Sequence, residues 1–127
     1  MKKYLWILPV TALCLVLAGP SAFSKKSKKK EPAVRSFTSV NIQFKGTKVW
    51  VPGTFIVKKG ESVKIKLVNN APSGKHGFAI DEFGVKVVTM KGSPQTVEFT
   101  ADKAGLFRIY CQLHKAHIGG QLLVLSH

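Results

Sequence analysis

Short runs of alternating apolar and polar residues dominate the chain from about residue 37 to its end. Between Val63 and Leu67, apolar residues alternate with lysines, which is the period-2 pattern of a strand with one buried face. The same alternation recurs in three further runs, 40–44, 97–99 and 107–111. No long segment shows the 3.6-residue period of an amphipathic helix, so the pattern predicts strands throughout.

Turn-forming residues separate these runs at short intervals. Pairs and clusters of Gly, Pro, Asn and Ser lie at 52–53, 59–60, 69–74, 83–84, 92–94 and 104–105. This spacing allows about seven or eight short strands, which matches a small Greek-key β-sandwich. The 91 residues from 37 to 127 are enough for one hydrophobic core but not for two. We therefore predict a single all-β sandwich domain over residues 37–127.

The beginning of the chain has the pattern of a secretory signal peptide. Two lysines precede an apolar run from Leu5 to Ala18, and small residues follow as far as Ser24. The alternative is an uncleaved membrane anchor, but the run is interrupted by Pro9 and is short of the ~20 residues that a spanning helix needs. We expect residues 1–24 to be removed and the protein to be periplasmic or secreted.

Charge is the unusual feature of the composition, with 20 Lys and Arg against 6 Asp and Glu. A block of lysines between Lys25 and Lys30 holds much of the excess, and such a block with little apolar content is typical of disorder. We expect a Lys-rich linker over residues 25–36, with weak contact to an anionic membrane surface as the alternative. Nucleic acid is not an expected partner, because an exported protein meets little of it and no stacking-aromatic motif is present.

Metal-binding residue types gather near the end of the chain, at Cys111, His114 and His117. Thiolate and imidazole are ligands that zinc and copper prefer. Removal of the signal peptide would take Cys14 away and leave one thiol in a disulfide-permissive compartment. A free thiol there is a liability unless it is buried or bound to metal, which favours a metal site.

The strand pattern indicates how such a site could assemble. Cys111 shares its strand face with Phe107 and Ile109, so we expect its thiol to point inward at the strand's end. His76 stands where a turn-rich loop enters another strand, and a sandwich gathers its loops at two ends, so His76 can join the cluster. The alternative is a buried structural cysteine beside ordinary loop histidines. Zinc could use the same donors, but structural zinc sites more often hold several cysteines, which favours copper.

These residues resemble the cupredoxin pattern of an upstream histidine, a cysteine at a strand end, a histidine soon after and a weak axial ligand. The chain is most similar to the nitrosocyanins, or red-copper cupredoxins, in segments 57–60, 77–85, 99–105 and 111–114. The resemblance implies a cupredoxin fold and one copper ion held by His76, Cys111 and His114. His117 stands where the axial methionine would be, and His76 replaces the glutamate ligand of nitrosocyanins. The implied site therefore contains one cysteine and three histidines.

Such a copper site implies single-electron transfer through Cu(I) and Cu(II) rather than an enzyme. The implied partner is a redox protein such as a c-type cytochrome or an oxidoreductase. A nitrosocyanin-like enzyme or sensor of nitric oxide or another small molecule is the alternative, although four protein ligands leave no open position. Copper delivery or storage is a third, although the mature chain would keep only Met90 and Cys111 as sulfur donors. No catalytic residue is predicted, because neither a serine nucleophile motif nor an acid to orient a Cys-His dyad is evident.

Overall fold

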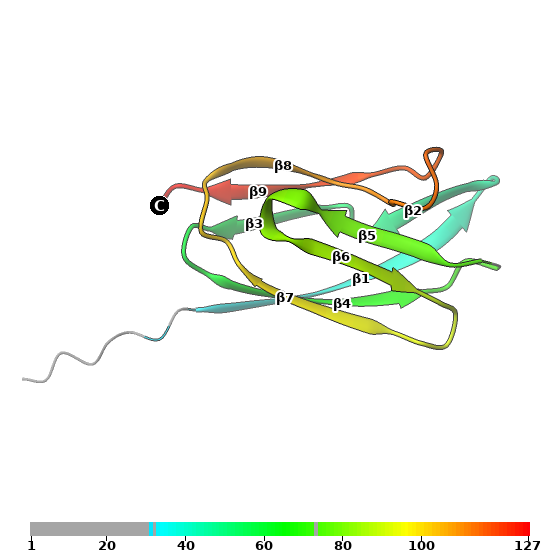
Figure 1. Ribbon diagram of the computed structural model, residues 1–127, viewed down its shortest axis with the longest axis horizontal. Coiled ribbons are helices and arrows are strands. Elements are labelled where there is room, and N and C mark those ends of the chain that lie inside the picture. The colour runs from blue at the N-terminus through cyan, green and yellow to red at the C-terminus, as the bar shows by residue number, and fades with distance from the viewer. Residues whose placement is uncertain (1–30, 32, 73) are drawn as a thin grey trace, which may run out of the picture.

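The computed structural model describes residue 31, residues 33–72 and residues 74–127 (Figure 1). The predicted signal peptide and the lysines at 25–30 lie outside these described residues. Within them the chain forms nine strands and one short 3-10 helix. The predicted all-β class is confirmed, with slightly more strands than the turn spacing suggested.

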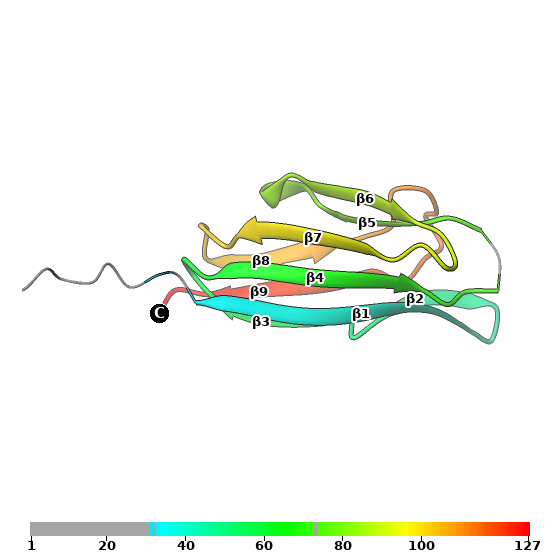
Figure 2. The same ribbon diagram turned by 90° about the horizontal axis from the view of Figure 1, so that it is seen from below.

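Two layers of strands face one another (Figure 2). The first layer has the order β2-β1-β4-β7 and comprises β1 (Val34–Phe44), β2 (Thr47–Val51), β4 (Ser62–Asn69) and β7 (Gln95–Thr100). The second layer contains the order β3-β9-β8, from β3 (Thr54–Lys58), β9 (Gly120–Leu125) and β8 (Gly105–Ile109). The β1–β4 and β3–β9 pairs are parallel, and the other pairs in these two sheets are antiparallel.

A hairpin extends the second layer. It consists of β5 (His76–Ile80) and β6 (Val85–Thr89), joined by the 3-10 helix η1 (Asp81–Phe83). Ala79 and Tyr110 exchange two backbone hydrogen bonds of 2.9 and 3.1 Å, which attach β5 to the chain just after β8. Because this pairing is antiparallel, the start of β5 lies beside the residues that follow Tyr110.

The hydrophobic core fills the space between the layers. Val63, Ile65 and Leu67 are buried on the inner face of β4, as their alternation predicted. Trp50 and Phe55 both contact the ring of Phe78 in edge-to-face geometry, with ring centroids 5.5 and 6.5 Å apart. The Trp50 contact joins the first layer to the hairpin, and the Phe55 contact joins the hairpin to β3.

Strand β1 differs from the prediction in where it begins and in which of its side chains are buried. It begins at Val34, so the last residues of the predicted 25–36 linker belong to the sheet, where they pair in parallel with the start of β4. Their side chains are exposed, so no apolar alternation marks them. The buried side chains of β1 are Ser39 and Asn41, while Phe44 is 65% exposed. Buried polar groups need hydrogen-bond partners, and Ser39 donates to the carbonyl of Pro52.

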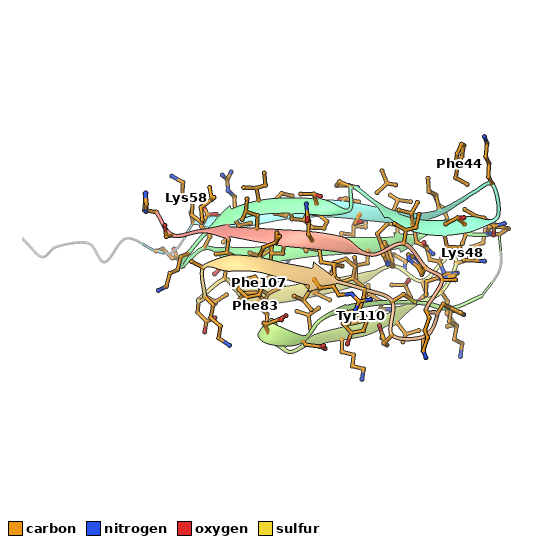
Figure 3. The ribbon with its side chains drawn as sticks, turned by 90° about the horizontal axis from the view of Figure 1, so that it is seen from above. Phe44, Lys48, Lys58, Phe83, Phe107 and Tyr110 are labelled. Carbon is orange, nitrogen blue, oxygen red and sulfur yellow. The ribbon has the colours of Figure 1, made fainter. Side chains whose placement is uncertain are left out.

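The connections β1–β2, β4–β5, β6–β7 and β8–β9 meet at one end of the sandwich, on the right in Figure 1. Figure 3 shows Phe44 and Lys48 at this end and Lys58 at the opposite end. Within the described parts of the chain, none of the helical segments has the length and apolar character needed to cross a membrane.

Candidate metal centre

Three of the predicted ligands meet at the end of the sandwich where these connections gather. His76 is the first residue of β5, Cys111 follows β8, and His114 lies on the loop towards β9. Their candidate donor atoms all lie within 4.8 Å of one another. The Cys111 Sγ atom is 3.6 Å from His114 Nδ1, and the His76 and His114 rings are 5.1 Å apart between centroids. The spacing suits a single metal ion among a thiolate and two imidazoles.

The three donor residues differ in how far they are exposed to solvent. His76 and Cys111 are buried, with 1% and 6% of their surface exposed, whereas His114 is exposed. Cys111 thus points inward beside the buried Ile109, as the β8 alternation predicted. An ion bound here would be shielded on one side and would reach the surface through the His114 ring.

Gly77 positions the sulfur atom. Its backbone N–H donates a 3.2 Å hydrogen bond to Cys111 Sγ, and its carbonyl accepts a 2.9 Å hydrogen bond from Trp50 Nε1. A hydrogen bond to a thiolate favours the charged, metal-binding form of the side chain. Because Trp50 is in the core, the donor at Gly77 is anchored to the opposite layer.

Gln112 packs against the same glycine. Its Nε2 donates a 2.9 Å hydrogen bond to the carbonyl of Val87 on β6, while its Oε1 is buried and accepts no hydrogen bond. A Cβ atom at position 77 would collide with the Gln112 amide. A side chain at position 77 would therefore have to displace the Gln112 amide, which holds the cysteine segment against the β5–β6 hairpin.

His117 lies next to the three donors but outside their group. Its ring centroid is 5.4 Å from that of His76, and its Nε2 and Nδ1 atoms lie 2.9 Å from Asn41 Oδ1 and the carbonyl oxygen of Ile118. Burial lowers the pKa of the His117 imidazole below its usual range, against an opposing contribution from the Ile118 carbonyl. A neutral ring carries one proton and can donate to only one of these two acceptors. The assignment of His117 as the fourth ligand stays a prediction.

A pair of buried asparagines fixes the hydrogen-bond acceptor that faces His117 Nε2. Asn69 Nδ2 donates to the carbonyls of Gly74 and Thr89, at 3.2 and 3.3 Å, and Asn69 Oδ1 accepts the N–H of Ala71 at 3.0 Å. The Asn69 amide is thereby fixed, and its Oδ1 also accepts from Asn41 Nδ2 at 3.2 Å.

The orientation of Asn41 follows from that bond. Since Asn41 donates through Nδ2, it presents Oδ1 to His117 Nε2 and favours a proton on that nitrogen. A proton on Nε2 leaves the lone pair of a neutral ring on Nδ1, which then faces the carbonyl oxygen of Ile118 at 2.9 Å without a hydrogen bond.

The sequence analysis missed Asn41, Asn69 and Gln112. Asn69 continues the inner face of β4 two residues after Leu67, so the alternation that located this strand also places Asn69 inside. Its position before Asn70 instead suggested a turn. No comparable signal marks Gln112, because its role depends on β6.

Two hollows flank the exposed His114 ring. The larger has a volume of about 450 Å³ and the smaller about 190 Å³. The larger is lined by Arg108, Tyr110, Cys111, Gln112, His114, Lys115 and His117. Lys48 lines the smaller one together with His114 and His117. The Tyr110 hydroxyl donates a 2.7 Å hydrogen bond to Asp81, which raises the Tyr110 pKa and directs that phenol along β5.

The fold and the cysteine-histidine cluster define a cupredoxin. The chain belongs to the cupredoxin-like domain family, whose model matches residues 10–124. It is 35% identical over 68 residues to a nitrous-oxide reductase of Cupriavidus necator, covering 50% of this chain and 11% of that protein. The chain thus spans only a small part of this relative. The predicted family is confirmed, and the closer resemblance to nitrosocyanins stays a prediction.

Solved structures share the fold at lower identity. The copper-containing nitrite reductase NirK of Thermus scotoductus matches with a TM-score of 0.62 at 22% identity, over 74% of this chain and 28% of the other. The solution structure of a copper-binding protein in its apo form matches with a TM-score of 0.56 at 21% identity, over 76% of this chain and 92% of the other. The second match indicates that this sandwich also occurs as nearly an entire protein.

We expect the Gly77→Ala substitution to displace the Gln112 amide and to lower the free energy of unfolding. The Gln112→Ala substitution removes the colliding group, so the double variant should be more stable than the two single losses together predict. A coupling of about 0.5–3 kcal/mol is typical of residues in contact. Urea denaturation of the four proteins of this cycle measures it. Additive losses would contradict the packing described for Gln112.

Replacing Asn41 by leucine should strongly destabilise the metal-free protein. The substitution leaves His117 Nε2 and Asn69 Oδ1 with fewer partners inside the core, at a cost of roughly 2–4 kcal/mol. Gln43→Leu, an exposed position on the same strand, is the matched control. Urea denaturation measures both, and ¹⁵N NMR of the His117 ring in the parent protein should find the proton on Nε2. Equal stability of the two variants would contradict the asparagine network.

Proposed function

We propose that the protein is an exported mononuclear copper protein that carries single electrons. The observation that carries this proposal is a buried thiol and two imidazoles whose donor atoms lie within 4.8 Å, with one of the imidazoles exposed. Proteins of related fold or sequence include a copper-containing nitrite reductase and a copper-binding protein. The donor set fits copper, because one thiolate and two histidines form the equatorial ligands of mononuclear copper sites for electron transfer.

In this proposal each residue has a distinct role. Cys111 binds as a thiolate, and the Gly77 N–H stabilises the charge on its sulfur. His76 closes the buried side, and His114 links the site to the surface. When bound, copper supplies one-electron exchange between its Cu(I) and Cu(II) states. Donors held by strands and core contacts need little rearrangement between the two states, which favours rapid transfer.

We assign His117 as the fourth residue that would hold the copper, through its Nδ1 atom. The support is the asparagine pair, which occupies Nε2 and leaves the other nitrogen without a competing fixed donor. Ligation requires the ring to exchange its contact with the Ile118 carbonyl for the metal. An imidazole stabilises Cu(II) more strongly than the usual thioether, so the potential should be low and the colour shifted away from pure blue, as in red-copper proteins.

A second candidate function is the binding of a small molecule such as nitric oxide at the copper. The observation that favours it is the hollow of about 450 Å³ that reaches Cys111 and His114 beside the basic side chains of Arg108 and Lys115. An open copper position requires that His117 stays with Asn41 and Ile118 rather than ligating. Optical titration of the copper-loaded protein with nitric oxide or azide separates this function from simple electron transfer.

Copper-loaded protein should show a thiolate-to-copper absorption and a Cu(II) EPR signal at one copper per chain. The His117→Met variant should have a higher potential and a bluer spectrum, because a thioether is the weaker axial ligand. Cys111→Ser is the control and should lose the thiolate absorption. Optical spectra, EPR and voltammetry measure these changes.

Two outcomes would count against these assignments. Unchanged spectrum and potential in the His117→Met variant would remove His117 from the ligand set. A colourless protein that retains stoichiometric zinc in preference to copper would overturn the electron-transfer function itself.

A further inference from the structure

The end of the sandwich that carries the candidate site has an excess of positive charge. The connections at this end, residues 44–48, 70–75, 90–94 and 110–119, contain five lysines and no Asp or Glu. The lysines are Lys45, Lys48, Lys75, Lys91 and Lys115. We call this set, together with the exposed apolar side chains of Leu113 and Ile118, the lysine face.

The structure places these lysines around the candidate site. Lys48 and Lys115 line the two hollows beside His114. Lys75 directly precedes His76, and Lys91 pairs with Asn69 in a backbone bridge. Figure 3 shows Lys48 at this end of the molecule. All but Lys48 are exposed, and the two ion pairs found among the described residues involve other cations.

The carboxylates lie elsewhere. Glu61 and Asp102 stand in the turns at the opposite end, where Glu61 is paired with Arg35 at 3.3 Å. The acidic residues of η1 follow the far end of β5 from His76, and Asp81 among them accepts the hydrogen bond of Tyr110 at the edge of the larger hollow. Glu98 on β7 is paired with Lys64 at 2.7 Å. The excess positive charge of the folded domain is therefore concentrated where the metal ligands are, and it is not neutralised there.

Exposed apolar side chains lie at the same end, on the connection between β8 and β9. Leu113 and Ile118 are 47% and 53% exposed, and they lie on the loop that carries His114 and His117. A small apolar centre with a charged rim is the usual composition of a protein–protein contact surface. His114 is exposed beside them and offers the shortest route from the buried sulfur to a bound partner.

We infer that the lysine face docks a redox protein whose own electron-transfer centre is surrounded by Asp and Glu side chains. This inference rests on the proposed function, because an electron carrier must bring a second redox centre close to His114. Opposite charges on the two faces steer the encounter and raise the association rate at low salt. A lipid headgroup surface has matching charge but accepts no electron, which favours an acidic protein.

The test uses the copper-loaded full chain and two c-type cytochromes, one with an acidic haem edge and one with a basic haem edge. Stopped-flow spectroscopy measures the rate constant of electron exchange at several salt concentrations. We expect exchange with the acidic cytochrome to be faster and to slow as salt rises, because screening weakens the attraction. The double variant K91E/K115E should lose about tenfold or more of this rate at low salt.

The matched control is K59E/K103E, which makes the same change in net charge at the opposite end of the sandwich. It should change the rate by less than about twofold at ~0.1 M salt, where the Debye length is about 10 Å and charges at the far end are largely screened. Both variants keep Lys25 to Lys30, so that segment contributes equally. The copper spectra of the variants should match the parent protein, which excludes damage to the site.

The outcomes separate the inference from the proposed function. If copper does not cycle even with small inorganic reductants and oxidants, the proposed function fails and the docking inference fails with it. If copper cycles but the two double variants lose rate equally, or the basic cytochrome reacts faster, only the lysine face is overturned. Binding to phosphatidylglycerol vesicles that depends on Lys91 and Lys115, without effect on cytochrome exchange, would assign the face to lipid instead.

Discussion

The hydrogen bond from the Gly77 N–H to the Cys111 sulfur is the contact on which the arrangement of the site depends. It joins the start of β5 to the chain just after β8 at the point where sulfur must stay buried. The surrounding contacts protect it. Trp50 holds the other side of the same residue from the core, the Gln112 amide covers the space that a side chain would fill, and Ala79 exchanges backbone hydrogen bonds with Tyr110 nearby.

The second constraint is the burial of two amides in a small core. Asn41 and Asn69 occupy inner-face positions of adjacent parallel strands, where apolar side chains would ordinarily stabilise the sheet. Their hydrogen bonds are nearly all satisfied, so the network costs little once it is complete and much if one member is removed. The network ends on His117. The asparagine network therefore links the orientation of the His117 ring to the packing of β1 and β4.

Much of this could be predicted from the sequence, because local alternation follows directly from burial. The runs in β4 and β8 were placed correctly, including the inward thiol of Cys111. The encounter of His76 with Cys111 required only the general rule that loops of a sandwich gather at its ends. Strand β1 was located but its buried face was not, because Ser39 and Asn41 are buried through partners that lie far away in sequence.

Dependence on partners that are distant in sequence also explains why the rest of the site could not be predicted. The environment of His117 depends on an asparagine from a strand 76 positions away, and the role of Gln112 depends on β6. No local pattern carries such information. The charge around the site is different, since the lysines are visible in the sequence, but their common location appears only when the connections are brought together by the fold.

The position of β9 has a consequence for when a metal can be held. This strand comes last in chain order among the described elements, yet it lies between β3 and β8 and joins them into one sheet. The loop with His114 is held at both of its ends only when β9 is paired with its two neighbours. A loosened β9 would therefore release His114 from His76 and Cys111, although none of these three donor residues lies on β9 itself.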